Sequence, residues 1–193
     1  MKIAGVVLCG GKSSRYGTQK IFETFQGEYL YERSLNPFLS AGLPAYLLTN
    51  KILSPLFPTE PAARILVEKE QYQGPLYGLY SSIEMLPAFE SIFMLPADVP
   101  WVHTGFVRHM LWHASRRMPD YHALIPVSGG RIHPVHGIYH RHVYAQAERV
   151  LQEGERSMQP LLERIRPFYL SFSDTEPAFI NINRKTDWNH SQE

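Results

Sequence analysis

Cysteine is almost absent from this sequence: Cys9 is the only one among 193 residues. A single thiol excludes an intramolecular disulfide and cysteine-rich zinc sites. It suits a reducing compartment, so we expect the protein to be cytoplasmic. The N-terminus also lacks the charged-then-apolar layout of a signal peptide, because it leads directly into an apolar run that starts at Ile3.

Long apolar runs and a strong net charge are missing as well. No stretch reaches the roughly eighteen consecutive apolar residues of a transmembrane helix, so we expect no membrane span. The formal net charge is +1, which excludes a global field that would attract nucleic acid or a membrane surface. There is no internal repeat, low-complexity tract or linker, and the length is that of one ordinary domain. We therefore expect a single domain over residues 1–193.

Two well-known phosphate-binding patterns are absent, although glycines follow the apolar run Ile3 to Cys9. A P-loop would require Gly at position 6, which is Val6. A dinucleotide fingerprint would require Gly where Lys12 stands, two residues after Gly10. The segment still combines a strand exit with glycines, hydroxyls and cations, which favours an anionic ligand such as a polyphosphate. The alternative is an ordinary strand-to-loop turn with solvated charges.

Apolar runs alternate with helical periodicity along the chain, and this alternation predicts an α/β fold. Such a fold has three layers, with helices on both faces of a mainly parallel sheet. A turn at 128–130 predicts a late antiparallel hairpin in addition. The predicted strands are 3–9, 45–49, 64–68, 91–95, 121–127, 134–139 and 168–172. The predicted helices are 29–42, a short one within 55–61, 74–86, 104–117, 141–153, 157–165 and a short one from Thr186.

Several chemically distinctive segments follow directly after predicted strands. They are the Gly10 loop, Asn50, the Glu68–Gly78 segment and Asp98. The carboxyl ends of parallel strands meet at one edge of a sheet, and ligands of such sheets bind beyond that edge. The sequence therefore predicts that all four segments share one site.

Asp98 is the candidate metal ligand of this site. It follows an apolar strand and is bracketed by Pro96 and Pro100, which stiffen the loop and remove competing N–H donors. A carboxylate held in this way suits Mg²⁺, which takes few protein carboxylates and several phosphate oxygens. The alternative is a turn or helix-capping aspartate.

Two further features predict nucleotide contacts. Gly74 and Pro75 begin a helix, and a helix start leaves unpaired N–H groups that attract anions. Arg15 and Lys20 offer phosphate a planar fork and a point charge, respectively. The alternatives are a simple helix entry and a solvated cationic surface.

Residues 8–20 follow the spacing L-x-G-G-x-S-x-R-x-G-x-x-K, which resembles the signature of the molybdenum cofactor guanylyltransferase family. Similar matches to this family occur at Gly74–Gly78, Ala97–Pro100, His133–Gly137 and Phe179–Asn183. The resemblance covers nearly the whole chain and implies a Rossmann-like nucleotidyltransferase fold. It departs from the family in two places. No Asp precedes Gly74–Gly78, so Glu68 or Glu70 must stand in for it, and we prefer Glu68 because it lies at the strand end. Arg184-Lys185 replace Thr-Pro.

The resemblance also implies roles for individual residues. Asp98 would bind the Mg²⁺, Lys20 the nucleotide phosphates, and Arg15 the leaving pyrophosphate or second substrate; these three are the expected catalytic residues. The pterin substrate would contact His133, Asn181 and Asn183. The expected nucleotide-binding residues are Leu8, Cys9, Gly10, Gly11, Lys20, Asn50, Glu68, Gly74, Pro75, Leu76 and Asp98.

The implied reaction is transfer of GMP from GTP to molybdopterin, with release of pyrophosphate. The sequence contains no nucleophilic triad, and this reaction needs none because the attacking phosphate is already anionic. The resemblance suggests other molybdenum-cofactor assembly proteins or molybdoenzyme chaperones as partners. The alternatives are a cytidylyltransferase acting on the same cofactor, a sugar-phosphate nucleotidyltransferase, or a non-catalytic nucleotide-binding module.

Overall fold

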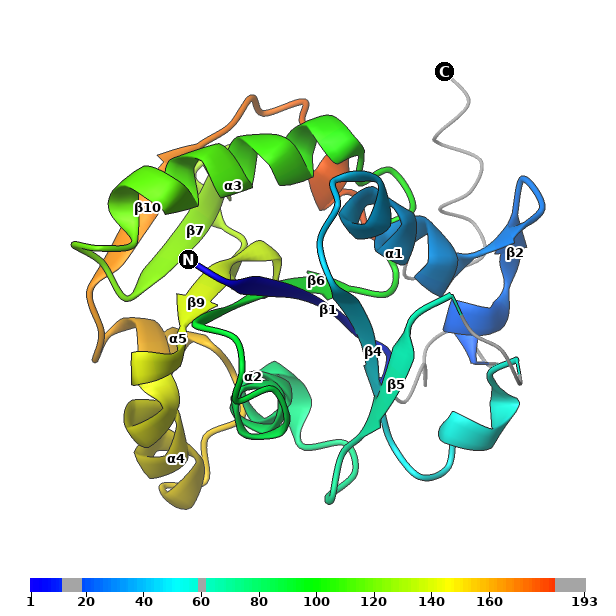
Figure 1. Ribbon diagram of the computed structural model, residues 1–193, viewed down its shortest axis with the longest axis horizontal. Helices are drawn as coiled ribbons and strands as arrows, with labels where there is room; N and C mark the ends of the chain where they lie inside the picture. Colours follow the sequence, from blue (N-terminus) through cyan, green and yellow to red (C-terminus); the bar gives the residue numbers. More distant parts are fainter. Residues whose placement is uncertain (12–18, 59–61, 183–193) are drawn as a thin grey trace.

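The computed structural model describes residues 1–11, 19–58 and 62–182, which fold around a central twisted sheet (Figure 1). The sheet has eight strands in the order β10-β7-β9-β6-β1-β4-β5, with β8 paired to β7 alone. Its strands are β1 (Ile3–Leu8), β4 (Ala45–Thr49), β5 (Arg64–Val67), β6 (Ser91–Pro96), β7 (Ala123–Ser128), β8 (Arg131–Ile132), β9 (Ile138–His140) and β10 (Pro167–Ser171). A separate pair consists of β2 (Thr24–Phe25) and β3 (Glu28–Tyr29).

Helices cover both faces of this sheet (Figure 1). The α-helices are α1 (Leu30–Ser40), α2 (Gly74–Met85), α3 (Thr104–Arg117), α4 (Tyr144–Gln152) and α5 (Gln159–Leu162). Short 3-10 turns are η1 (Lys20–Phe22), η2 (Ser54–Leu56), η3 (Pro134–His136), η4 (Arg141–Val143) and η5 (Pro177–Phe179). One apolar core lies under α1 and α3, and a second lies under α2, α4 and α5. The predicted three-layer α/β fold is confirmed.

Strand β1 lies inside the sheet, between β6 and β4, and its residues are apolar or small on both faces. Ala4, Val6 and Val7 are fully buried, which is typical of a parallel strand covered on both sides. A Cβ at Gly5 would lie 2.6 Å from the ring of Phe38 in α1. Helix α1 therefore packs directly against the backbone of β1, and this contact sets the distance between the helix and the sheet.

The late antiparallel part of the sheet differs from the prediction at 134–139. The return strand of the hairpin is β8, because Gly129 and Gly130 both have positive φ and close a tight turn directly before it. The next residues form η3, since Pro134 lacks an N–H and has a fixed φ. Strand β9 then enters the sheet between β6 and β7, antiparallel to both. It follows that β6 and β7 run in the same direction.

Other boundaries shift for local reasons. The predicted helix 141–153 begins with η4 and continues as α4, and the predicted helix 157–165 is reduced to α5. The short helix predicted within 55–61 is η2, and the one predicted from Thr186 lies outside the described residues. Within the described ranges no helix is long and apolar enough to cross a membrane.

Candidate active site

The candidate site lies at the carboxyl edge of the parallel strands. The register places Leu8 beside Leu48 of β4 and beside Pro96 of β6, and it places Thr49 beside Val67 of β5. All four segments predicted from the sequence therefore leave the sheet at the same edge. The structure therefore shows that these four segments lie at one edge of the sheet, whereas their roles in binding remain predictions.

Gly10 is held against two polar side chains from neighbouring strand exits. The buried Asn50 donates from Nδ2 to the Gly10 carbonyl oxygen at 3.3 Å, and its Oδ1 accepts the N–H groups of Ile52 and Leu53. A Cβ at Gly10 would lie 3.0 Å from Oε2 of Glu68. A side chain at this position would therefore require the Glu68 carboxylate to shift by a few tenths of an ångström.

Glu68 is the most strongly perturbed carboxyl group of the site. It follows β5, and only 7% of its surface is exposed. Burial raises its pKa to about 7, because the charged form loses hydration that no cation replaces in the described part of the chain. Near neutral pH the group is therefore divided between its acid and its carboxylate form.

Two backbone groups at the end of β1 form hydrogen bonds with neighbouring strands and loops. The Leu8 carbonyl oxygen accepts the N–H of Ala97 at 3.3 Å, and the Cys9 N–H donates to the Leu48 carbonyl oxygen at 2.7 Å. These two groups are not available to a ligand. The Cys9 thiol is buried, and burial together with the charge of Asp98 raises its pKa far above the usual range, so it is unreactive. Gly11 is exposed, with nothing within 4 Å of an added Cβ.

The turn into α2 is braced by a distant loop. Gly74 has φ +82°, and an added Cβ would lie 2.8 Å from the carbonyl oxygen of Arg156. The same carbonyl accepts the N–H of Leu76 at 3.3 Å, while Arg156 Nε donates to the Gln73 side chain at 2.7 Å. The expectation of unpaired N–H groups is therefore wrong for Leu76, whose side chain is also fully buried. Nothing in the local sequence indicated Arg156.

Lys20 and Asp98 form the electrostatic centre of the site. Lys20 Nζ lies 2.5 Å from Asp98 Oδ2, and both side chains are only 15% exposed. The same ammonium donates to the carbonyl oxygen of Ile182 at 2.9 Å. Asp98 Oδ1 is buried without a hydrogen-bond partner in the described ranges. An oxygen of this kind is a fitting ligand for a divalent cation.

No cluster of three or more His, Cys, Asp or Glu side chains that could hold a metal occurs in the described part of the chain. This argues against a metal cage made only of protein ligands there. A hard cation bound through a single carboxylate and substrate phosphates needs no such cage. The buried Oδ1 of Asp98, unpartnered within the residues that the structure describes, therefore fits a divalent cation whose other ligands do not come from a protein cage.

The late motifs meet around Phe179. The His133 ring stacks on Phe179 with centroids 4.0 Å apart, and the buried His136 packs against the same ring. His136 also hydrogen-bonds the backbone of Ala178, and burial lowers its pKa to about 3. These contacts position the backbone that leads to Ile182, whose N–H donates to the Asp98 carbonyl oxygen at 2.9 Å.

An extended strand at 180–183 would place Ile180 and Ile182 on one face and the asparagines on the other, and the described residues depart from this pattern. Ile182 is fully buried whereas Ile180 is 48% exposed, so the two do not share a face. The reason is that this segment follows η5 rather than extending as a strand. Asn181 is exposed. Two predicted site residues, Arg15 and Asn183, lie outside the described residues.

A small structural unit beside Asp98 was not anticipated from the sequence. Phe25 of β2 packs edge-on against Trp101 with centroids 5.9 Å apart, and Arg33 of α1 lies over the Phe25 ring. Arg33 Nε donates to the Pro100 carbonyl oxygen at 3.0 Å. The β2–β3 hairpin thus braces the loop that carries Asp98. Gly27 at its tip, with φ +84°, was the available signal.

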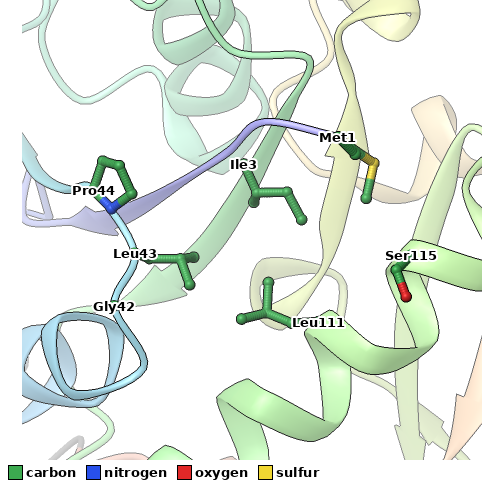
Figure 2. A pocket seen from close by; sticks show the side chains of 7 residues that line it. All are labelled: Met1, Ile3, Gly42, Leu43, Pro44, Leu111 and Ser115. Carbon is green, nitrogen blue, oxygen red and sulfur yellow. The ribbon is translucent and has the colours of Figure 1, made fainter.

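An apolar hollow of about 330 Å³ lies elsewhere, between the N-terminus, the end of α1 and α3 (Figure 2). It is lined by Met1, Ile3, Gly42, Leu43, Pro44, Leu111 and Ser115. Ile3 begins β1 and Pro44 precedes β4, so the hollow lies at the amino edge of the sheet. It contains no charged side chain and is opposite the edge that carries Asp98.

Comparisons with known proteins identify similar sequences and folds. A family model described as a MobA-like NTP transferase domain matches residues 5–168. A probable molybdenum cofactor guanylyltransferase of Geobacillus sp. is 32% identical over 97% of this chain and 96% of the relative. A relative of the same description from Halalkalibacterium halodurans is 29% identical over 95% and 94%. The crystal structure of molybdopterin-guanine dinucleotide biosynthesis protein A from Archaeoglobus fulgidus superposes with a TM-score of 0.77, at 22% identity over 98% and 96%.

Proposed function

Because this chain belongs to the MobA-like NTP transferase family, we propose that it is a molybdenum cofactor guanylyltransferase. It transfers GMP from GTP to the terminal phosphate of molybdopterin and releases pyrophosphate. The family predicted from the sequence motifs is confirmed. The observation that carries the function is the ion pair between Lys20 and Asp98 at the sheet edge, beside the glycine exit of β1.

The nucleotide lies against the exits of β1, β4 and β5 in this proposal. Gly10 and Gly11 leave room for the base to approach the backbone, and Asn50 fixes the Gly10 carbonyl oxygen. Glu68 accepts a hydrogen bond from the nucleotide, in the position where the family has an Asp. The start of α2, at Gly74-Pro75-Leu76, closes the pocket, with Leu8 and Cys9 below it.

Asp98 is the residue that would hold the divalent metal, which we take to be Mg²⁺. Its buried Oδ1 has no hydrogen-bond partner among the described residues and is available to a cation. When bound, Mg²⁺ neutralises the charge of the phosphates at the reacting centre. The Pro96 and Pro100 loop and the β2–β3 hairpin keep the carboxylate in place.

Transfer requires positioning and charge neutralisation rather than proton abstraction. The terminal phosphate of molybdopterin attacks the α-phosphorus of GTP, a new P–O bond forms, and the bond to pyrophosphate breaks. Lys20 holds the phosphates of the nucleotide, and Arg15 neutralises the leaving pyrophosphate.

The pterin approaches from the late segments of the chain. His133 is half-buried and stacked on Phe179, and Asn181 is exposed on the segment that reaches Asp98 through Ile182. We assign both residues, together with Asn183, to the pterin substrate. We treat residues 1–193 as one domain that acts in the cytoplasm, with cofactor assembly proteins or molybdoenzyme chaperones as partners.

The test is an assay with GTP, MgCl₂ and molybdopterin that follows both pyrophosphate and the guanine dinucleotide. We expect both products, and we expect Asp98→Ala to form neither while melting like the wild type. Preference for CTP in a parallel assay would identify a cytidylyltransferase. Nucleotide binding without pyrophosphate release would identify a non-catalytic module.

A further inference from the structure

Asp98 is already neutralised by a protein cation. Lys20 Nζ lies 2.5 Å from its Oδ2, and the Ile182 carbonyl oxygen holds the same ammonium from another side at 2.9 Å. The two side chains are equally and largely buried, so water screens the pair only weakly. The ammonium therefore occupies one of the two oxygens that a metal would use.

The geometry points to a competition: Lys20 and a divalent cation exclude each other from Asp98, and the nucleotide's triphosphate resolves this by drawing Lys20 away. A cation on Oδ1 would lie within a few ångströms of the ammonium on Oδ2. Repulsion at such a distance weakens cation binding by about tenfold or more, even at the high effective dielectric of a partly exposed site. The metal-free pair is thus a resting state in which Lys20 takes the place of the metal.

Lysine suits this exchange better than arginine would. Its ammonium is a compact point charge on a flexible stem, so it can move from one anion to another without matching a fixed fork. The Ile182 carbonyl oxygen keeps the ammonium at the site while its anionic partner changes, because a carbonyl is neutral and competes with neither anion. Ile182 is itself bound to the Asp98 loop, because its N–H donates to the Asp98 carbonyl oxygen. Its own carbonyl oxygen accepts the hydrogen bond from Lys20, so this tether belongs to the Asp98 loop.

The consequence is coupled binding. Metal and nucleotide enter together, because each is bound poorly while the other is absent. Coupling between two ligands is reciprocal, so the nucleotide raises the affinity for the metal by the factor by which the metal raises the affinity for the nucleotide. This inference rests on the proposed function only for the identity of the triphosphate.

The decisive measurement is Mn²⁺ binding at pH 8 without nucleotide, followed by the electron paramagnetic resonance signal of free Mn²⁺. Lys20→Gln removes the charge and keeps an N–H donor, so we expect it to bind Mn²⁺ at least about tenfold more tightly than the wild type. Lys20→Arg keeps the charge, so its affinity should stay at the wild-type level. The double variant Lys20→Gln, Asp98→Asn should lose the gain. Equal Mn²⁺ affinity of wild type and Lys20→Gln overturns the proposal.

A wild-type experiment covers the case in which the variants fail to fold. Crystals soaked in MnCl₂ alone should retain the Lys20–Asp98 pair without manganese on Asp98, whereas a soak with MnCl₂ and GTP should place manganese there with the pair broken. Manganese on Asp98 beside an intact pair would contradict the competition. Neither measurement involves GMP transfer, so a failed transfer assay combined with tighter Mn²⁺ binding by Lys20→Gln would refute the function and leave this inference standing.

Discussion

Replacing Glu68 by Gln should change how the stability of the protein depends on pH. Burial raises the pKa of this carboxyl to about 7, whereas in the unfolded chain it is about 4.5. Between these values the native state keeps a proton that the unfolded state has lost. The free energy of unfolding therefore falls as pH rises from about 4.5 to about 7. Glu68→Gln cannot lose a proton there, so it should not show this part of the decline.

The size of the effect follows from the shift. A change from 4.5 to about 7 corresponds to at most about 3 kcal/mol. Glu68 is not fully enclosed, since 7% of its surface is exposed, and solvent screening reduces this to about 1–2 kcal/mol. For a chain of this length, the melting temperature of Glu68→Gln relative to the wild type should rise by about 3–6 °C between pH 4.5 and pH 8.

Thermal melting followed by circular dichroism at half-unit pH steps measures this difference. Other groups that titrate, His136 among them, act equally in both proteins and cancel in the comparison. The matched control is Glu70→Gln, because Glu70 is exposed two residues further along the same segment. If the difference in melting temperature between wild type and Glu68→Gln stays constant over the whole pH range, Glu68 does not have the raised pKa that its burial implies.

Three further variants test other contacts. Gly10→Ala places a methyl group 3.0 Å from a carboxylate oxygen, so GTP binding measured by calorimetry should weaken by about tenfold, and an unchanged affinity would argue against close approach of the nucleotide to Gly10. Gly74→Ala should lower the free energy of denaturant unfolding by about 1–3 kcal/mol. It should do so by more than Gly42→Ala, since both have positive φ but only Gly74 meets a backbone oxygen. Burial lowers the pKa of His136 to about 3, so the free energy of unfolding of the wild type should fall as pH drops below about 6.5. His136→Gln should not show this loss. Equal acid sensitivity of wild type and His136→Gln would argue against a buried neutral imidazole.

The sequence predicted most of the parallel sheet because its signals are local. Apolar runs such as Ile3 to Cys9 and Ile92 to Leu95 end in Gly, Asn, Glu or Asp, and the carboxyl-edge rule then placed these ends together. It could not predict that β9 would lie between β6 and β7, because this position depends on contacts between distant segments. The Lys20–Asp98 ion pair was missed for the same reason. The sequence pattern assigned Lys20 to the nucleotide phosphates and Asp98 to the metal, and it gave no sign that the two side chains contact each other.

The tether through Ile182 escaped prediction for a different reason. The interacting group is a backbone carbonyl oxygen, which every residue possesses and which no side-chain pattern indicates. The β2–β3 hairpin was overlooked because its strands are only two residues long, too short for a period-2 signal. Both features concern residues that support the site rather than those expected to contact substrate.

The insertion of β9 has a consequence for how the chain is made. During synthesis the N-terminal segments emerge first, and β1, β4, β5 and β6 can pair as soon as Pro96 has left the ribosome. Strand β7 has no partner in that half, because β9 separates it from β6. Until His140 has emerged, β7 can pair only with the two-residue β8, at Val127 and Ser128, so most of the apolar segment Ala123–Ser128 remains an unpaired edge. This interval is when the nascent chain is most exposed to aggregation.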